Sequence, residues 1–584
     1  MNVDGQYIYG ITVVCPGMSF QYAQISAMHF MYKRVNMRAG ALYAGNVRWA
    51  DKDLTGVDWY HARHIGSYQS PGKLKLERRM FQRVKVSSAH IVHLRPEEAC
   101  DSFIKSTKGK VEAGYIDAGV RAEVLRRVMY MDGQAATEAE MASWVVYVRT
   151  APEWAVAYVN RVLSYITTRQ EMYNVLKTEG IMAKQMQGNS LQNMSTLFEL
   201  NVLQNRTDGQ IDWANEKQKR KYFKKHIDIT RNEVVEIASN IFRVALSEGK
   251  TPVTTSWKDY WDLRWSKAPS GSFVSQYDDD MVYKKRFTHH TSATKANVLA
   301  SMPGYKFNYF YQRKPEVYAS TSVKYEWGKI RALYGCDITS FLMSDFSMPG
   351  CDNCLPDYMP IGQSAEENKV RRRVNGMKGG IPVCYDYDDF NAQHSVEAMQ
   401  GVILAYVNVF GPYMSREQKA AADWTIKSLG NQNVYCSQAG ESYKALGTLF
   451  SGWRLTSFVN TVLNRVYLEK ANLKTHLLYA LHNGDDVFAI ADSFENVIKM
   501  FADAEEKGLK AQSTKQNIGT IAEFLRIDLF ADEPDASQYL TRACATITHG
   551  RIEADESFSL DDEIKAVITR GSAIVNRGGD REAA

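Results

Sequence analysis

The chain has 584 residues with 71 basic and 66 acidic side chains, so its formal net charge at pH 7 is +5. The length allows about four average domains, and so mild a charge excludes a uniformly basic nucleic-acid surface, which leaves local cation clusters to bind phosphates. Eight scattered cysteines exclude a disulfide framework. Cys351 and Cys354 have zinc spacing, but no second Cys or His pair lies close by in the sequence.

Residues 1–300 are expected to alternate between helical and irregular stretches, and they contain no motif that we can assign to a chemistry. One helix is clear, because Pro152 opens a segment with a single apolar stripe. The stripe consists of Ala155, Tyr158, Val159, Val162, Leu163 and Ile166. A basic run at 217–225 includes two aromatic residues and could bind RNA phosphates and bases; a solvated helix face is the alternative. The same alternatives hold for the three arginines at 371–373.

A second basic segment, 324–334, spaces Lys324, Lys329 and Arg331 so that several cations could lie along one extended stretch. Such a strip can bind a triphosphate, since the Arg guanidinium offers a planar fork to phosphate oxygens. An ordinary charged surface strand is the alternative.

A short apolar strand at 381–385 runs directly into an acidic cluster that begins with Asp386. Pro382 suits the start of that strand, where its missing N–H costs least. A helix is predicted to begin near Ser395, with Glu397 in its first turn and an apolar stretch behind it. Asp386 therefore stands at a strand end, where a cation can reach it.

The segment 447–464 predicts a helix that follows a flexible Ser451–Gly452 loop. Its apolar residues follow the i, i+3, i+4 rule, which makes one face core; they are Leu455, Phe458, Val459, Val462, Leu463 and Val466. Thr456, Asn460 and Asn464 share another face. That polar stripe suits hydrogen bonds to a nucleotide sugar and a template backbone, although most amphipathic helices have a solvent-facing polar stripe.

Two apolar runs, 477–481 and 489–491, flank the segment 482–488, which contains Gly484, Asp485 and Asp486. The pattern predicts a strand, a tight turn and a second strand, with two carboxylates at the tip. Adjacent carboxylates suit Mg²⁺, which prefers hard oxygen ligands, although an ordinary hairpin is the alternative. Two strands that end in carboxylates on one sheet could hold two metal ions about 4 Å apart. Asp386 and Asp485 are the predicted pair.

Downstream, Ser493 is predicted to cap a helix that Gly508 ends. Its predicted apolar face consists of Phe494, Val497, Ile498, Phe501 and Ala502. The following loop carries Lys510 and Lys515, and 522–527 reads as a hairpin strand.

The order of these segments resembles motifs F and A to E of viral RNA-dependent RNA polymerases. The amino-acid sequences of segments 451–464 and 544–553 are most similar to those of polymerases of totiviruses and related double-stranded RNA viruses. The resemblance covers about 324–553. It implies an α+β, right-hand fold of fingers, palm and thumb, with an antiparallel palm sheet flanked by helices. It also implies an RNA-directed RNA polymerase that transcribes and replicates a viral genome by two-metal nucleotidyl transfer.

Carried over by position, the resemblance makes Asp386 and Asp485 metal ligands for two Mg²⁺ ions, or Mn²⁺ in their place, with Asp486 a weaker ligand. Nucleotide contacts would come from Lys324, Lys329, Arg331, Asn391, Ser451, Gly452, Thr456 and Asn460. Lys324, Lys329 and Arg331 would contact the triphosphate, while Ser451 and Gly452 would position the template. Asn391 departs from the family pattern, since many RNA polymerases have Asp there; ribose discrimination would rest on Asn391 and Asn460. Lys515 would protonate pyrophosphate, with Lys510 as a competitor.

The resemblance also implies an organisation and a set of partners. Residues 1–300 would hold an N-terminal extension and part of the fingers, 301–380 the fingers with the nucleotide-entry motif, 381–530 the palm with inserted fingers segments, and 531–584 the start of a thumb. So short a thumb suggests a portion of a longer viral polyprotein. Template and product RNA, NTPs and viral capsid protein, including as a capsid–polymerase fusion, would be partners.

Further expectations concern location and rival functions. No apolar run reaches about eighteen residues, the length that a membrane helix needs, and no signal pattern opens the chain. We therefore expect no membrane partner and a soluble, intracellular protein, in the host cytoplasm inside the virion or capsid. Two alternative functions are a reverse transcriptase-like palm polymerase and a non-catalytic RNA-packaging protein with a polymerase fold. The Ser-Gly, Thr and Asn pattern argues against the reverse transcriptase.

Overall fold

The computed structural model forms two compact units. The first consists of Met1–Gln210, Tyr325–Ile330 and Thr514–Ala584, and the second of Ile211–Lys324 and Arg331–Ser513. The structure describes residues 2–3, 6–7, 9–15, 18–24, 72–82, 90–131, 133–186, 193–206, 210–225, 227–269, 271–288, 293–375, 377, 379–512, 516–519, 521, 523–525, 527–528, 539–551 and 560–584.

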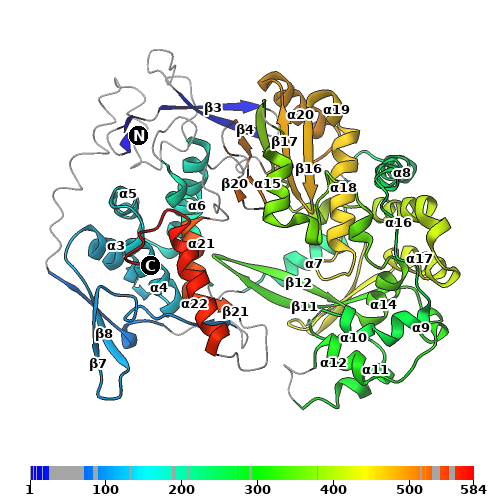
Figure 1. Ribbon diagram of the computed structural model, residues 1–584, viewed down its shortest axis with the longest axis horizontal. Coiled ribbons are helices and arrows are strands. Elements are labelled where there is room, and N and C mark those ends of the chain that lie inside the picture. Colours follow the sequence, from blue (N-terminus) through cyan, green and yellow to red (C-terminus); the bar gives the residue numbers. More distant parts are fainter. Residues whose placement is uncertain are drawn as a thin grey trace. The chain divides into compact units, whose positions relative to one another are not determined.

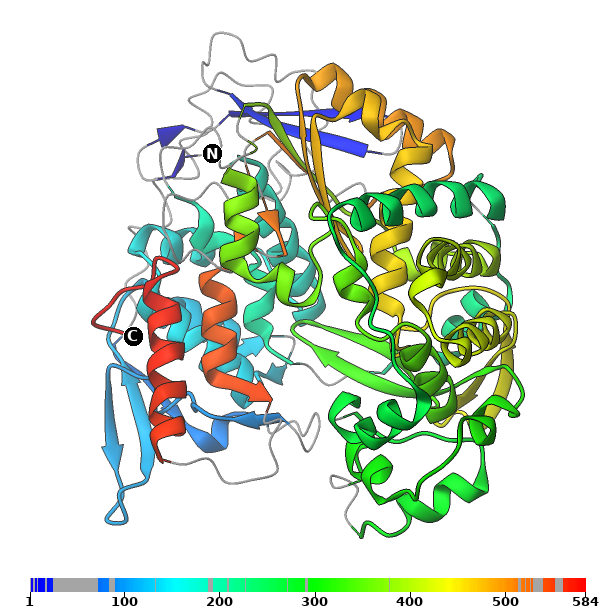
Figure 2. The ribbon, with the colours of Figure 1, turned by 45° about the vertical axis from the view of Figure 1, so that its right-hand side comes forward.

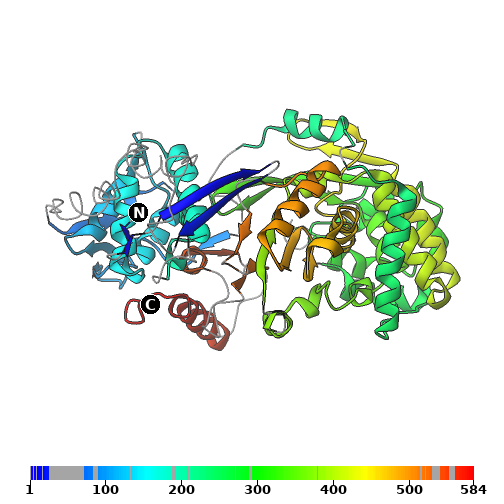
Figure 3. The ribbon, with the colours of Figure 1, turned by 90° about the horizontal axis from the view of Figure 1, so that it is seen from above.

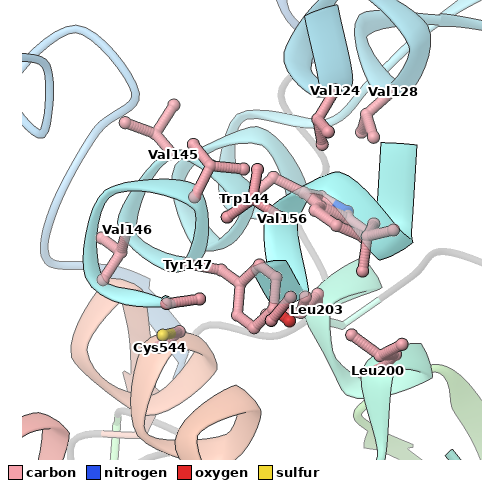
Figure 4. Packing of buried hydrophobic residues seen from close by; sticks show 14 of the residues in the cluster. Val124, Val128, Trp144, Val145, Val146, Tyr147, Val156, Leu200, Leu203 and Cys544 are labelled. Atoms are coloured by element: carbon pink, nitrogen blue, oxygen red, sulfur yellow. The ribbon is translucent and has the colours of Figure 1, made fainter. Parts of the chain in front are cut away.

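Helices build the core of the first unit (Figure 1). They are α3 (Val120–Met129), α4 (Glu138–Thr150), α5 (Glu153–Leu163), α6 (Arg169–Met186), α21 (Leu540–Thr548) and α22 (Leu560–Val575). Nearly every residue of α4 is buried, because neighbouring helices cover it on several sides. Figure 4 shows Trp144 and Tyr147 of α4 among apolar side chains of other elements, and Cys544 of α21 belongs to the same cluster. The predicted helix after Pro152 is confirmed as α5, with its stripe in this core.

Strands also occur in the first unit, so the expectation of only helical and irregular stretches before residue 300 is wrong. One antiparallel sheet has the order β5 (Leu74–Glu77), β8 (Val111–Ile116), β7 (Ser102–Lys105). A long hairpin joins β3 (Tyr9–Cys15) to β4 (Met18–Gln24), as Figure 3 shows in blue. β5 and β7 have four residues each, so period-two alternation was too weak a signal to identify these two strands. The predicted hairpin strand near 522–527 is confirmed, since β19 (Glu523–Phe524) pairs with β20 (Ile527–Asp528).

The second unit contains the strands that end in acids. Antiparallel β16 (Tyr479–Asn483), β17 (Asp486–Ala491) and β13 (Ile381–Tyr385) lie side by side in that order. Figure 1 shows α18 (Thr456–Lys470) alongside β16. The predicted strands and the helix after the Ser451–Gly452 loop are thereby confirmed.

A mixed sheet and a helical layer complete the second unit. The sheet order is β12 (Lys329–Cys336), β11 (Val317–Glu326), β14 (Gln432–Cys436), β15 (Glu441–Ala445), with β11 and β14 parallel. Helices α8 (Arg231–Ser247), α16 (Val396–Phe410) and α17 (Arg416–Leu429) pack together (Figure 2). Ser395 caps α16 as predicted. Aromatic residues from α9 (Trp257–Asp262), α13 (Phe307–Tyr311) and α14 (Ile338–Ser347) form a separate core with Trp424 of α17.

Helix α20 (Phe494–Glu506) departs from its predicted face. Ser493 caps it as expected, but Phe494, Ile498 and Ala502 are exposed. The buried residues are Val497, Met500, Phe501 and Ala504. The predicted stripe followed an i, i+4 line of apolar side chains, whereas the side that packs follows i, i+3, i+4, i+7.

The mixed helix and sheet architecture agrees with the predicted α+β class, and β16, β17 and β13 are antiparallel as expected. The boundaries of fingers, palm and thumb stay predictions. The compact units divide the chain differently, since 211–300 belongs with the acid-bearing strands. Within the described residues, no helix combines the length and apolar character that crossing a membrane requires.

The core of the first unit gives a stability prediction. Trp144 is fully buried, so Trp144→Ala should lower the free energy of unfolding of this unit by about 3–5 kcal/mol through lost packing and a cavity. Hydrogen exchange of peptides from α4 and α5 measures this better than a global curve, because a chain with two units need not unfold in one transition. Tyr130→Ala, at a side chain with 62% exposure, is the control and should change protection little. Equal loss in both variants would contradict the packing argument.

Candidate active site

The three predicted acids lie at one end of the β13–β17 pair. The last paired residues are Tyr385 and Val487, so the register places the next residue of the chain, Asp386, opposite Asp486. Asp485 and Asp486 are exposed at the hairpin tip. Gly484 occupies the left-handed region at φ +57°, which permits so tight a turn. The structure therefore brings the acids of two distant segments to the same edge of one sheet.

The chemistry of these donors fits a hard divalent cation that also has substrate ligands. Carboxylate oxygens suit Mg²⁺, which is usually held by one or two carboxylates plus phosphates of a nucleotide. Among the described residues, no three His, Cys, Asp or Glu side chains are arranged to hold a metal by themselves. Asp386 and Asp485 are thus suited to part of a coordination shell and not to a closed protein cage.

Helix α18 holds the hairpin turn by three side-chain hydrogen bonds. Thr461 Oγ1 accepts from the Gly484 amide at 2.8 Å. Asn464 Nδ2 donates to the carbonyls of Gly484 and Asp486 at 3.0 and 3.2 Å. Asn464 is fully buried, so neither the predicted contact with a sugar or template nor the solvent-facing alternative holds for it. Its amide instead fixes the backbone that carries the acids.

Further contacts hold Asn464 itself. Its Oδ1 accepts from the Tyr387 hydroxyl at 3.2 Å and lies 3.0 Å from Nδ1 of His482. Burial lowers the pKa of His482 well below its usual value, so the ring is neutral at pH 7. Because the Tyr387 hydroxyl and His482 Nδ1 both donate to Oδ1 of Asn464, the Nδ2 end of this amide faces the turn. Sequence periodicity could not reveal this role, because a polar residue on a helix indicates solvent until a partner is known.

The Asp386 segment is fixed on its other side by the loop after α20. The Gln512 amide donates to the Asp386 carbonyl, and the Asp388 amide to the Lys510 carbonyl, each at 2.9 Å. Gln393 bonds the Lys510 backbone twice, with Nε2 donating and Oε1 accepting, each at 3.0 Å. The loop of Lys510 thus lies beside the acidic strand end. Lys515, the predicted proton donor, lies outside the described residues.

The Ser451–Gly452 loop is held and not flexible, contrary to expectation. Gly452 forms a parallel bridge with Gly335 of β12, and a Cβ on Gly452 would lie 2.3 Å from the Tyr334 carbonyl oxygen. Only glycine permits this approach. Thr456 Oγ1 donates to the carbonyls of Phe450 and Trp453 at 2.7 and 2.8 Å. The hydroxyl proton of Thr456 therefore serves the loop, while its predicted nucleotide contact stays a prediction.

An ion pair that the sequence did not predict adjoins the loop. Arg454 Nε lies 2.6 Å from Asp345 Oδ1, and the Tyr260 hydroxyl donates to the other Asp345 oxygen at 2.9 Å. Asp345 is buried in α14, so the pair links the loop to the helical core. Lone charges 109 residues apart give no sequence signal of such a pair.

Asn391 and Asn460, the predicted ribose-reading pair, contact each other. Asn460 Nδ2 donates to Asn391 Oδ1 at 2.8 Å, and Asn460 is 8% exposed. The Asn391 carbonyl accepts from the Leu449 amide and the Thr448 hydroxyl, both at 3.0 Å. The pair therefore joins the acidic segment to α18 and to the residues just before Ser451.

The predicted basic strip is a hairpin and not one extended segment. β11 and β12 are hydrogen-bonded neighbours, and Trp327 and Gly328 connect them, with Gly328 at φ +66°. Lys324 and Arg331 are exposed and equally far from this connection, on neighbouring strands of the second unit. Lys329 is exposed at the tip, in the first unit, with its Nζ 3.5 Å from Glu326 Oε2. The glycine between the two runs was the signal for a turn.

Two other predicted patches have internal partners. Among the three arginines at 371–373, Arg373 Nη1 donates to the Ser364 carbonyl at 2.9 Å. In the basic run, Lys217 pairs with Glu441 at 2.5 Å and Arg220 with Glu216 at 2.7 Å. Phe223 packs directly against Gly447, where a Cβ would lie 2.4 Å from the ring. Helix α7 (Trp213–Lys221) carries most of this run. The run therefore takes part in contacts within the protein, whether or not it also binds RNA.

The cysteines with zinc spacing are buried packing residues. Cys354 accepts from the Tyr406 hydroxyl at 3.7 Å, and burial raises the pKa of both thiols of the Cys351 and Cys354 pair. Raised pKa values oppose the thiolate form that zinc requires. No described residues nearby complete a metal site with them.

Comparisons with known proteins identify relatives across most of the chain. The family described as viral RNA-directed RNA polymerase matches residues 104–552. A probable RNA-directed RNA polymerase of Saccharomyces cerevisiae virus L-BC is 38% identical over 571 residues, which cover 95% of this chain and 36% of the relative. The corresponding protein of Saccharomyces cerevisiae virus L-A is 34% identical over 515 residues, covering 85% and 33%. The chain thus spans about a third of the length of these relatives.

A buried histidine beside the asparagine pair gives a pH prediction. Burial lowers the pKa of His394 to about 4, against about 6.5 in an unfolded chain. Below about pH 6.5 the unfolded chain binds a proton that the folded chain does not, so stability should fall as the pH falls towards about 4. Between about pH 7.5 and 5 the wild type should lose about 2 kcal/mol relative to His394→Gln.

Urea-dependent hydrogen exchange of peptides from α16 and α18 measures that difference at each pH. Other titrating groups are common to both proteins and cancel in the comparison. Parallel stability curves for the two proteins would mean that His394 is not held neutral.

Proposed function

The chain belongs to the viral RNA-directed RNA polymerase family, and we propose that it catalyses RNA-templated nucleotidyl transfer onto an RNA 3′-hydroxyl. The observation that carries the proposal is the β13–β17 register, which sets Asp386 opposite Asp486 and beside the tip that bears Asp485. Phosphoryl transfer depends mainly on positioning and charge neutralisation. A rigid turn that presents carboxylates to solvent provides the positioning.

We assign the metal-binding role to Asp386 and Asp485, with Asp486 as a weaker ligand. Two Mg²⁺ ions, or Mn²⁺ in their place, would neutralise the triphosphate and lower the pKa of the attacking 3′-hydroxyl. The protein's own contribution is to fix the carboxylates. Thr461 and Asn464 do so through the turn, while Gln512 and Tyr387 hold the Asp386 segment.

The remaining roles follow the same order along the chain. Exposed Lys324 and Arg331, with Lys329 at the hairpin tip, would contact the triphosphate, for which guanidinium and ammonium groups are suited. Ser451 and Gly452 would position the template, since their backbone is held against β12. Asn391 and Asn460 would read the ribose. Thr456 would act on the nucleotide through the loop that it holds.

The rival functions are weaker on specific grounds. A reverse transcriptase accepts sugars without a 2′-hydroxyl, and a hydrogen-bonded pair of amides at the sugar position favours a site that recognises that hydroxyl. A non-catalytic RNA-packaging protein would have no need for exposed acids on a turn held by three hydrogen bonds.

We also propose template and product RNA, NTPs and viral capsid protein as partners, including a capsid–polymerase fusion, and the host cytoplasm, within the virion or capsid, as the location. In the right-hand arrangement, the palm would contain β13, β16 and β17, within 381–530. The assignments of 1–300, 301–380 and 531–584 to the extension, fingers and thumb belong to the same proposal.

The central test is Asp485→Asn. The substitution should abolish incorporation of labelled NTPs on a primed RNA template, while folding and RNA binding stay nearly unchanged, because the exposed tip acid has few packing contacts. Asp492→Asn, at an exposed acid just beyond the other end of β17, is the matched control and should retain incorporation. Near-normal incorporation by Asp485→Asn with Mg²⁺ would remove Asp485 from the metal site.

The proton donor to pyrophosphate is the second test. We assign it to Lys515, so Lys515→Met should lower the single-turnover rate by about 10²- to 10⁴-fold with little change in nucleotide Kd, as expected for a general acid. Lys510→Met should do much less, because it keeps the backbone bond of residue 510 to Asp388 and, on this assignment, removes no proton donor. Pre-steady-state incorporation across pH decides between them; a larger loss and an altered pH profile in Lys510→Met would move the role there.

A further inference from the structure

A continuous chain of hydrogen bonds runs from the core of the second unit to Asn391. His394 Nδ1 lies 3.0 Å from the Tyr467 hydroxyl, and His394 Nε2 lies 2.7 Å from Asn460 Oδ1. Asn460 Nδ2 then donates to Asn391 Oδ1 at 2.8 Å. Tyr467 and His394 are fully buried, whereas Asn391 is only half-buried. The chain thus begins in the core and ends at a residue that a ligand can reach.

The chain has one polarity. A carbonyl oxygen can only accept, so Asn460 Oδ1 requires the proton of His394 on Nε2. A neutral ring then has a bare Nδ1, which must accept from the Tyr467 hydroxyl. Burial keeps both groups in these states, because it lowers the pKa of His394 to about 4 and raises that of Tyr467.

The polarity determines what Asn391 offers to a ligand. Its Oδ1 already accepts from Asn460, so its Nδ2 is the end of the amide that can serve as a donor. An Asp at this position would have only acceptors when ionised. The two side chains would therefore bind a ribose hydroxyl in opposite senses.

We propose that Tyr467 and His394 are positioning residues that orient the Asn460 and Asn391 amides so that Asn391 Nδ2 donates a hydrogen bond to the ribose 2′-hydroxyl oxygen of the incoming nucleotide. This inference rests on the proposed function. His394 and Tyr467 do not touch the sugar; they set which end of each amide faces it. Without them the Asn391 amide could turn and present its oxygen.

The test compares incorporation of NTPs, 2′-deoxy-NTPs and 2′-fluoro-2′-deoxy-NTPs by the full chain. Fluorine can accept a weak hydrogen bond but cannot donate one. The wild type should therefore discriminate less against the fluoro than against the deoxy substrate, and Asn391→Asp should reverse that order. An unchanged order in Asn391→Asp would overturn the assigned polarity.

The positioning role is tested by His394→Leu, which should narrow the NTP over 2′-deoxy-NTP ratio of kcat/KM by about fivefold, the effect of one neutral hydrogen bond. His394→Gln keeps an N–H donor for Asn460 and should restore the ratio. His476→Gln, at a buried histidine that instead bonds Asp503, is the matched control. Equal losses for both substrates in His394→Leu would show a merely structural role and overturn the proposal.

A second variant covers a failure of His394→Leu to fold. Tyr467→Phe removes only the hydroxyl that fixes the ring tautomer, and it should narrow the same ratio; an unchanged ratio would overturn the proposal. The proposed function fails separately, because its failure appears as absence of NTP incorporation by the wild type, and the inference would then fall with it.

Discussion

The hydrogen bonds between Asn464 and the 484–486 turn are the constraint on which the site depends. The buried Asn464 amide donates to two backbone carbonyls and so fixes the turn that carries Asp485 and Asp486. Inside the protein such bonds are strong, and an unpaired buried amide or carbonyl is costly, so the arrangement has few alternatives. The acids themselves can remain exposed, because the rigidity comes from the backbone beneath them and not from contacts of their carboxylates.

Helix α18 positions three separate segments through side chains spaced four residues apart. Thr456 bonds the loop that contains Ser451, Asn460 bonds the segment after Asp386, and Asn464 bonds the hairpin turn. Residues four apart lie on one helical face, so these contacts follow one side of α18. Segments from 386 to 486 are thereby set at fixed spacing, and a change in one contact is expected to reach the others through the helix. The Ser451–Gly452 loop, the Asn391–Asn460 pair and the hairpin turn would then move as one body.

Local signals were sufficient for the elements near the acids and insufficient for what their side chains bond. Gly484 between apolar runs, Ser395 before an apolar stretch and Pro382 at a strand start each act within a few residues, and β16, β17, α16 and β13 follow them. The stripe of Thr456, Asn460 and Asn464 was ambiguous, because a polar helical face suits solvent, ligand or a buried partner equally well. Only the position of the neighbouring sheet decides, and that depends on the whole fold. His394, Asp345 and Arg454 gave no periodic signal at all.

The asparagine at 391 explains why this site requires an oriented histidine. The two oxygens of a carboxylate are equivalent, so an Asp there would accept hydrogen bonds whichever way it turned. An amide has a donor end and an acceptor end, and it discriminates between ligands only if its orientation is fixed. Asn391 also adds no charge to a segment that already bears Asp386, Asp388 and Asp389, where another carboxylate would add like-charge repulsion. A neutral amide beside the acids therefore needs a buried neutral group to fix its orientation, and His394, through Asn460, is placed to be that group.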